Sequence, residues 1–171
     1  RPSSMAGANE NQSAVSGISL FSPASGNKLD INNEYTARSF MTALNNAAAF
    51  DEESVKIYDD ANKLRKSLYK HYFQNYFPLT PQSNGSNEWL AMQFGGKKNG
   101  FAVVYKREDV KKDEFILIMN GLSDGKSYTL HDYDNPKKPL GTFTGKQLMS
   151  GGVKLKISDA PKSMIVLYKV K

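Results

Sequence analysis

The sequence contains no cysteine, only one tryptophan and only two histidines among its 171 residues. Without cysteine the chain forms neither a disulfide nor a thiolate metal site, but its compartment stays open, since secreted bacterial proteins often lack cysteine too. Long hydrophobic runs are also missing: no apolar stretch approaches the roughly 20 residues that span a bilayer. We therefore expect a globular protein without a membrane partner, in agreement with the mean hydropathy of −0.54.

Acidic residues are scarce in the second half of the chain. Residues 97–171 hold 15 lysines and arginines against 8 acidic residues, whereas residues 1–96 hold 8 against 9. A basic half is one sign of nucleic-acid binding. The lysines here come as scattered pairs in turns and at strand ends, where sheet proteins use them to keep edges soluble. We therefore expect a solvated basic surface and no nucleic-acid partner, with polyanion binding as the remaining alternative.

The clearest helix covers residues 51–73. Acidic residues in its first turn and basic residues toward its end both suit the helix dipole. The helical pattern stops before Pro78, which lacks a backbone donor. Apolar residues at helical spacing form one stripe, namely Ile57, Tyr58, Ala61, Leu64, Leu68 and Tyr72. A shorter helical segment is expected over residues 41–50.

From Trp89 onward the hydrophobic period changes from 3.6 to 2, which predicts strands. Turns that contain glycine separate these strands every 8–12 residues or so, a spacing typical of an antiparallel sandwich or barrel. The expected strands are residues 89–94, 100–106, 114–119, 127–132, 153–157 and 163–170, with a short edge strand at 140–144.

The first 50 residues give weaker signals. Residues 1–13 are small and polar and predict a loop. Residues 14–21 form a short apolar run typical of a buried strand, and residues 35–41 fit either a strand or the start of a helix. One or two buried strands without partners are not stable alone. Together with a start at Arg1 that has neither an initiator methionine nor a signal-like core, this predicts a piece of a larger α/β protein.

A set of short motifs runs along nearly the whole chain in a characteristic order. The stretches are Gln12 with Gly17-Ile18-Ser19-Leu20-Phe21 and Pro23, Tyr35 with Arg38-Ser39, Tyr76-Phe77-Pro78-Leu79-Thr80, Trp89 with Ala91 and Gln93-Phe94, Gly121-Leu122 with Tyr128, Gly145 with Leu148-Met149, and the closing strand from Met164 to Tyr168. In this order and spacing they resemble the C-terminal end of glycoside hydrolase family 36, the bacterial α-galactosidase group.

The resemblance implies an α+β chain: the last strands and helices of a catalytic (β/α)8 barrel in residues 1–79, followed by a C-terminal antiparallel β-sandwich in residues 80–171. Residues 14–21 and 35–39 would be the last two barrel strands. Active sites of such barrels lie at the carboxyl ends of the strands. Gln12, Arg38 and Ser39 would then be substrate-binding residues. The alternatives are a structural ion pair for Arg38 and plain structural hydrogen bonds for Gln12 and Ser39.

The family's chemistry, retaining hydrolysis of α-linked galactosides without a cofactor, needs two carboxylates roughly 5 Å apart. The resemblance implies a nucleophile upstream of Arg1 and an acid/base shortly before Gln12. That window holds Ser3 and Ser4 where an aspartate is expected, and serine is no carboxylic acid. Glu10 is the nearest carboxylate, but a solvated loop glutamate is its more ordinary interpretation. We expect this chain alone to be inactive, with an α-galactoside-like glycan and the rest of the parent barrel as its partners, in a secreted or periplasmic bacterial protein.

The other chemical patterns are weak. The run from His131 to Asp134 suggests a metal site, but neighbouring side chains of a strand point to opposite faces and no second histidine is near, so we expect no metal. Trp89, Tyr128 and Tyr133 could form a platform for sugar stacking, although aromatic residues in strands are more often core. A non-catalytic carbohydrate-binding or interaction β-sandwich module is therefore the alternative function.

Overall fold

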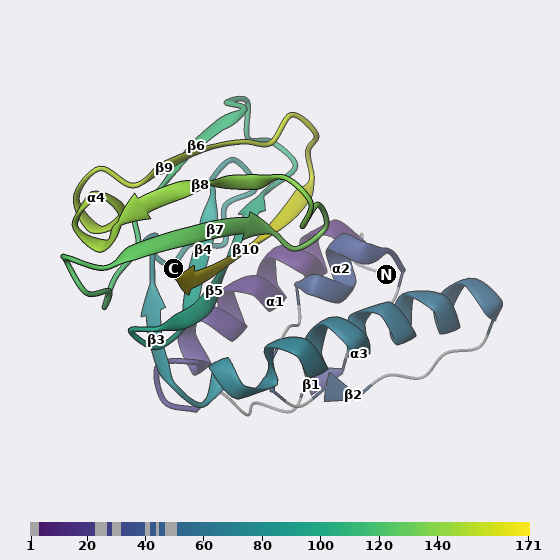
Figure 1. Ribbon diagram of the computed structural model, residues 1–171. Helices are drawn as coiled ribbons and strands as arrows, with labels where there is room; N and C mark the ends of the chain where they lie inside the picture. Colours follow the sequence, from purple (N-terminus) through teal and green to yellow (C-terminus); the bar gives the residue numbers. More distant parts are fainter. Residues whose placement is uncertain (1–3, 23–26, 29–31, 40–41, 44, 47–50) are drawn as a thin grey trace.

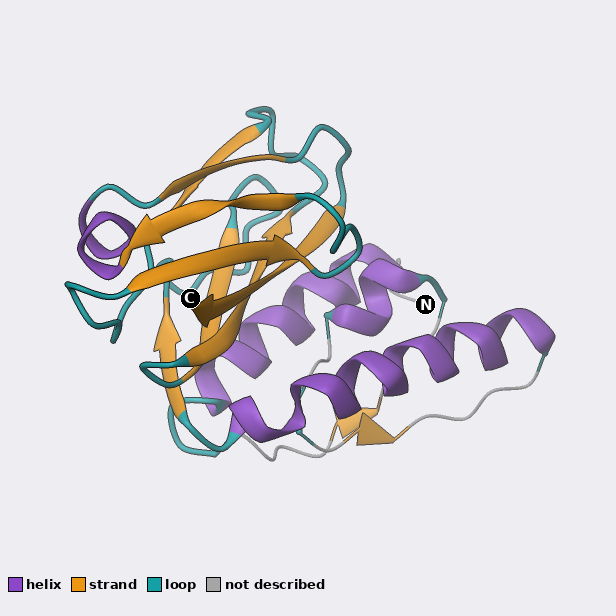
Figure 2. Cartoon of the chain, viewed as in Figure 1, coloured by secondary structure: helices purple, strands orange, loops and turns teal. Residues whose placement is uncertain are grey.

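The computed structural model describes residues 4–22, 27–28, 32–39, 42–43, 45–46 and 51–171. Within them an antiparallel six-stranded sheet separates a helical layer on one face from a two-stranded ribbon and a short helix on the other (Figures 1 and 2). The helices are α1 (Ser4–Ile18), α2 (Glu34–Arg38), α3 (Glu52–Tyr72) and α4 (Gly145–Ser150). None of the described helices is both long enough and apolar enough to span a bilayer.

The six-stranded sheet has the order β3-β4-β5-β10-β7-β8, and every neighbouring pair in it is antiparallel. Its strands are β3 (Asn75–Pro78), β4 (Leu90–Gly95), β5 (Asn99–Lys106), β7 (Ser127–Asp132), β8 (Pro139–Thr144) and β10 (Lys162–Val170). A separate ribbon pairs β6 (Glu114–Leu117) with β9 (Val153–Lys156). A third, parallel pair joins the two-residue strands β1 (Asn27–Lys28) and β2 (Asn45–Asn46).

The alternation of side chains in the central strands builds two cores. In β5, Phe101, Val103 and Tyr105 face the helices, whereas Ala102 and Val104 face the ribbon, as the period of 2 in a strand requires. On the helical side, the rings of Tyr72, Phe94 and Phe101 lie 4.9 to 5.3 Å apart, centroid to centroid. The central strands are thus covered on both faces.

One glycine in β5 is required by close approach. A Cβ atom at Gly100 would lie 2.5 Å from the Tyr168 hydroxyl oxygen, which crosses over this position from β10. That oxygen is already held by a hydrogen bond of 3.0 Å to the Gly96 carbonyl oxygen. No room for a side chain therefore exists at Gly100.

The expected helix over residues 51–73 is confirmed as α3. Asp51 caps it, because its side chain accepts a hydrogen bond of 2.8 Å from the Ser54 backbone N–H. The hydrogen bond from the Ser54 hydroxyl, and after it the one from the backbone N–H, lower the pKa of the Asp51 carboxyl. The strands expected after Trp89 are also confirmed, to within one or two residues at most ends. The short strand β3 was missed, because its two half-buried aromatic residues end in a proline, which a sheet tolerates only at an edge.

The strand expected at residues 14–21 is wrong, and at residues 35–39 the strand implied by the resemblance is wrong while the alternative, the start of a helix, is confirmed. Residues 14–18 belong to α1 and residues 19–21 to the turn after it, and residues 35–38 belong to α2. The expected loop over residues 1–13 is also wrong from Ser4 onward, where α1 begins. The predicted helical segment 41–50 falls mostly outside the described residues, and its described part includes β2.

The reason for the missed helix α1 is that its buried stripe is largely polar. Ala8, Gln12, Val15 and Ser19 follow one another at helical spacing and are all buried. Two of these four side chains carry hydrogen-bonding groups, so the apolar periodicity that signals an amphipathic helix is broken. At the coarse level the prediction of a mixed chain with a mostly antiparallel sheet is confirmed, while the barrel end, the sandwich and the division at residues 79 and 80 stay predictions.

Candidate functional site

A buried polar network joins α1 and α2 to the sheet. The Gln12 side-chain amide donates to the Tyr35 hydroxyl at 2.8 Å and to Ser39 Oγ at 2.9 Å. Ser39 Oγ in turn donates to the Tyr35 carbonyl oxygen at 2.8 Å. The amide oxygen of Gln12 accepts from Arg107 Nε at 3.0 Å. All four side chains are buried, so every bond in this network lies away from solvent.

Arg107, which directly follows β5, is the centre of this network and is fully buried. Its Nη1 group donates to the carbonyl oxygens of Ser83 and Gly85, both at 2.8 Å, and its Nη2 group donates to Ser13 Oγ at 3.0 Å. Burial lowers the pKa of the guanidinium. Among the described residues its hydrogen-bond partners are neutral oxygens, so hydrogen bonds rather than an ion pair compensate the buried charge.

Arg38 at the end of α2 is also buried, but it is paired with carboxylates. Its two terminal nitrogens each donate to one oxygen of Asp134 at 2.7 Å, and Nη2 also contacts Glu34 at 2.5 Å. Burial lowers the pKa of Arg38, but the Asp134 hydrogen bonds and the charges of Asp134 and Glu34 outweigh burial and raise it above its usual range. The Tyr105 hydroxyl donates to the Arg38 carbonyl oxygen at 2.6 Å, which fixes the end of α2 against the sheet. We call the three charged side chains the Glu34–Arg38–Asp134 bridge.

Two cavities flank the Glu34–Arg38–Asp134 bridge. The first, of about 340 Å³, lies between α2, α3 and the segment after β7, and it is lined by Glu34, Ala37, Arg38, Ile57, Asp60, Ala61, Lys63, Leu64, Tyr133 and Asp134. The second, of about 470 Å³, extends toward the segment between β9 and β10 and is lined by Glu34, Asp132, Asp134, Lys156, Ile157, Ser158, Asp159, Lys162, Ser163 and Met164. Glu34 and Asp134 line both cavities, so the bridge stands between them.

The carboxyl of Asp132 in the second cavity has a pKa raised above its usual value near 3.8. Burial is the largest cause, and the neighbouring charge of Asp134 adds to it. The charges of Arg38 and Lys162 and a hydrogen bond from the Asp134 backbone N–H at 3.1 Å act in the opposite direction. The two carboxyls of the second cavity therefore lie in different environments. The pKa of Asp132 is raised, whereas Asp134 is paired with Arg38.

The structure brings the three predicted substrate-binding residues together, in a setting that the sequence did not reveal. Gln12 and Ser39 are part of the buried network, and Arg38 lies next to it and lines the first cavity. Glu10 lies exposed on α1, and Ser3 lies outside the described residues. Whether Gln12, Arg38 and Ser39 bind substrate stays a prediction.

Sequence reasoning missed Arg107 and the pairing of Asp134. Arginine is rarely buried, and no pattern in the sequence distinguishes Arg107 from the surface lysines near it. Asp134 belongs to the run 131–134 that was considered as a metal site. No group of three or more His, Cys, Asp or Glu side chains placed to hold a metal occurs in the described part of the chain.

The aromatic platform considered from the sequence is not formed. Tyr128 and Trp89 pack on the ribbon side of the sheet, whereas Tyr133 packs on the helical side. The Trp89 ring lies 5.2 Å from that of Phe115, and Tyr128 is completely buried. Of the three residues, Tyr133 alone lines one of the two cavities beside the bridge.

Known proteins resemble this chain in fold but not detectably in overall sequence. No protein-family model and no curated protein sequence matches the chain. Among solved structures, the GH36 α-galactosidase AgaA from Geobacillus stearothermophilus in complex with raffinose is similar over 96% of this chain and 24% of its own, with a TM-score of 0.74 and 16% identity. The same enzyme in complex with 1-deoxygalactonojirimycin is similar over 81% of this chain and 19% of its own, with a TM-score of 0.61 and 15% identity.

An α-galactosidase from Lactobacillus brevis is also similar, over 86% of this chain and 22% of its own, with a TM-score of 0.62 and 12% identity. At such low identity these matches establish the fold. The resemblance to family 36 α-galactosidases expected from the sequence is thus confirmed as a similarity of fold. The chain spans about a quarter of the length of the first of these enzymes.

Proposed function

We propose that this chain is the C-terminal portion of a glycoside hydrolase of the α-galactosidase type, comprising the end of its barrel and the β domain that follows. The observation that carries this proposal is the structural similarity over 96% of the chain to a GH36 α-galactosidase whose structure holds raffinose. The order of sequence motifs supports it independently. The intact protein hydrolyses α-linked galactosides with retention and without a cofactor.

The isolated 171-residue chain is proposed to be inactive. Retaining hydrolysis needs two carboxyl groups held about 5 Å apart across the sugar. The only carboxylate of the α1 segment is Glu10, which is exposed on that helix. Asp132 ends β7 and Asp134 follows it, and both carboxylate oxygens of Asp134 accept hydrogen bonds from Arg38. The chain's role is then to complete and stabilise the catalytic part rather than to supply its carboxylates.

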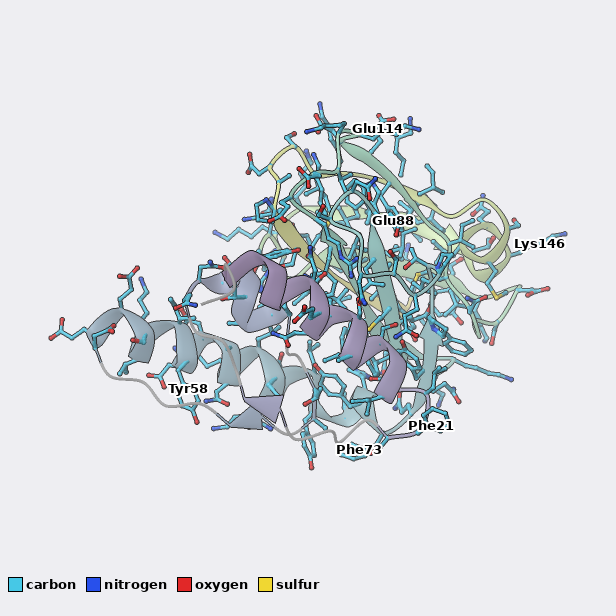
Figure 3. The ribbon with its side chains drawn as sticks, turned by 180° about the vertical axis from the view of Figure 1, so that it is seen from behind. Phe21, Tyr58, Phe73, Glu88, Glu114 and Lys146 are labelled. Atoms are coloured by element: carbon cyan, nitrogen blue, oxygen red, sulfur yellow. The ribbon has the colours of Figure 1, made fainter. Side chains whose placement is uncertain are left out.

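The outer surface of the helical layer supports the idea of a larger protein. Large apolar side chains are exposed at the end of α1 and on α3: Ile18, Leu20, Phe21, Val55, Tyr69 and Phe73. The side chain of Phe21 is 91% exposed, and Phe21 and Phe73 both lie along the lower edge of the molecule when it is seen from behind (Figure 3). Exposed apolar groups favour contact with more protein where they are contiguous, and the rings of Tyr69 and Phe73 are neighbours at 5.0 Å.

An activity assay tests the proposal directly. The 171-residue chain and the polypeptide extended by its encoded upstream sequence are each incubated with an aryl α-galactoside. Turnover by the extended protein and none by the chain alone is the expected result. Turnover by the chain alone refutes the placement of the catalytic carboxylates, and an extended protein that lacks βα alternation before Arg1 refutes the barrel.

A non-catalytic carbohydrate-binding role is the second candidate, and the cavities beside the Glu34–Arg38–Asp134 bridge favour it. The first of them combines apolar side chains and the Tyr133 ring with polar groups in a concave site, as small-molecule sites do. Sugar binding by this chain, combined with an extended protein that lacks hydrolytic activity, distinguishes this role from the first. Secretion or a periplasmic location stays a prediction for either role.

A further inference from the structure

We infer that the two cavities beside the Glu34–Arg38–Asp134 bridge form one binding cleft for a neutral sugar, with Tyr133 and the alanines of α2 and α3 as its apolar wall. The choice of sugar rests on the proposed function, but the site itself is argued from the geometry of the cleft.

The cleft has the size of a small-molecule site. Its two parts measure about 340 Å³ and about 470 Å³ and share Glu34 and Asp134. Sites for small ligands typically measure roughly 300–1,000 Å³. A ligand of one or two sugar rings would therefore contact the bridge from one or both sides.

The charges in the first cavity are largely compensated within the protein. Arg38 binds both Asp134 and Glu34, and Lys63 lies 3.2 Å from Asp60. A small ion would have to compete with these pairs. A hydroxyl group need not, because each oxygen of Asp134 accepts one hydrogen bond from Arg38 and keeps a further acceptor site. The bridge thus presents acceptors for ligand hydroxyls on carboxylates that each contact Arg38.

The first cavity also has an apolar lining with room beside it. Ala37 and Ala61 pack together with Ile57 between α2 and α3, and their short side chains leave the space open. The half-buried ring of Tyr133 borders the same space. Sugars pair an apolar face of C–H groups with a rim of hydroxyls, so a cavity that combines aromatic and aliphatic lining with a polar bridge fits them.

The polar side of the cleft is held in place before any ligand arrives. Asn33 and Thr36 form a capping box at the start of α2, with hydrogen bonds of 2.9 and 3.1 Å. The Tyr105 hydroxyl holds the Arg38 carbonyl oxygen at the other end of the helix. A preformed site loses less conformational entropy on binding.

The test is an NMR titration of the ¹⁵N-labelled 171-residue chain with methyl α-galactoside and with raffinose. Shifts of the backbone amides of Ala37, Ala61 and Tyr133 are expected, with a Kd on the order of 1 mM for a ligand of this size. In Ala61→Leu the larger side chain fills the cavity, and affinity should fall at least about tenfold, which corresponds to 1.4 kcal/mol. Ala14→Leu, on an exposed face of α1, is the matched control and should bind as the original chain does.

The spectrum of each variant reports its fold, and Tyr133→Ala offers a second test if Ala61→Leu is poorly folded. The cleft is overturned if neither sugar shifts these amides. It is also overturned if Ala61→Leu and Tyr133→Ala both bind the sugar with the affinity of the original chain. If putrescine, a dication, shifts the same amides and neither sugar does, the inference that the ligand is neutral is overturned. Hydrolysis by the extended protein without sugar binding by this chain supports the proposed function and overturns the cleft. Sugar binding by this chain without hydrolysis by the extended protein supports the cleft and overturns the proposed function.

Discussion

Gln12 of α1 and Arg107 after β5 are 95 residues apart in the sequence, and their side chains form a buried hydrogen bond of 3.0 Å. The bond joins the helical layer to the sheet at a point where neither partner contacts solvent. Both groups would be costly to bury alone, because an unpaired amide or guanidinium loses its hydration without compensation. The contact therefore ties the packing of α1 to the formation of the sheet.

Replacing Arg107 by methionine should destabilise the chain strongly. Arg107→Met removes the donors to Gln12 and to the carbonyl oxygens of Ser83 and Gly85 while keeping much of the apolar stem. We expect the free energy of unfolding to fall by about 2–4 kcal/mol, because several buried acceptors lose their partner. Urea unfolding followed by circular dichroism measures this. The exposed Lys169→Met is the control, and an equal loss in both variants would contradict a special role for Arg107.

Tyr72 and Tyr105 of the helical core should respond in different ways to loss of the hydroxyl. The Tyr72 hydroxyl is buried without a hydrogen-bond partner among the described residues, and burial raises its pKa strongly. Tyr72→Phe should leave stability unchanged or raise it by about 1 kcal/mol. Tyr105→Phe removes the bond to the Arg38 carbonyl oxygen and should cost about 1–2 kcal/mol. Thermal unfolding compares the pair, and a loss in Tyr72→Phe as large as in Tyr105→Phe would reveal a partner for the Tyr72 hydroxyl.

The two carboxylates that pair with Arg38 should contribute unequally. Asp134→Asn breaks a two-point contact with a buried guanidinium and should lower stability by about 1–2 kcal/mol, a value reduced because Asp134 is itself partly exposed. Glu34→Gln alters a contact of a more exposed carboxylate and should cost under about 0.5 kcal/mol. Denaturant unfolding at low and high salt gives both values. Equal losses of stability in the two variants would mean that the ion pair of Arg38 with Asp134 is no stronger than its ion pair with Glu34.

Asp132 should make the folded state less stable as the pH rises above its usual pKa. Its pKa is raised in the folded chain, so the folded state binds more protons than the unfolded state in the window directly above about pH 3.8. The free energy of unfolding then falls as the pH rises through that window. Asp132→Asn removes the half-buried charge but keeps an acceptor for the Asp134 N–H. The variant should gain stability at neutral pH and little at acidic pH, as measured by unfolding at both.

An equal gain of stability in Asp132→Asn at neutral and at acidic pH would contradict the link between the raised pKa of Asp132 and stability.

Two other carboxyls have pKa values that are lowered rather than raised in the folded chain. Hydrogen bonds from Ser54 and from Lys106 lower the pKa values of Asp51 and Asp113, so their contribution is present at neutral pH and lost as the pH falls. The comparison between Asp132→Asn and the original chain cancels these background effects.

The β region was predictable because each of its strands carries its own signal. Residues 153–156 alternate between buried and exposed positions, and Gly152, with a φ of +68°, permits the turn before them. Such local patterns do not depend on the rest of the chain. The same holds for α3, whose buried stripe from Ala61 to Tyr72 is apolar apart from His71. Its cap at Asp51 is local as well.

The candidate site was only partly predictable. Arg38 and Ser39 were selected by resemblance, and the resemblance placed them at the end of a strand, whereas the structure places them at the end of the helix α2. Their partners Tyr105, Arg107 and Asp134 come from parts of the chain 67 to 96 residues away from Arg38 or Gln12. No local pattern reports such a pairing.

By itself, the sequence determined the elements whose buried faces are apolar, namely α3 and the strands from β4 to β10, because hydrophobic periodicity is a property of neighbouring residues. Tertiary structure alone decided that residues 4–18 form a helix and that Arg107 is buried. Polar groups such as Gln12 can enter a core only when distant donors and acceptors satisfy them, and those partners are brought together by the folded chain.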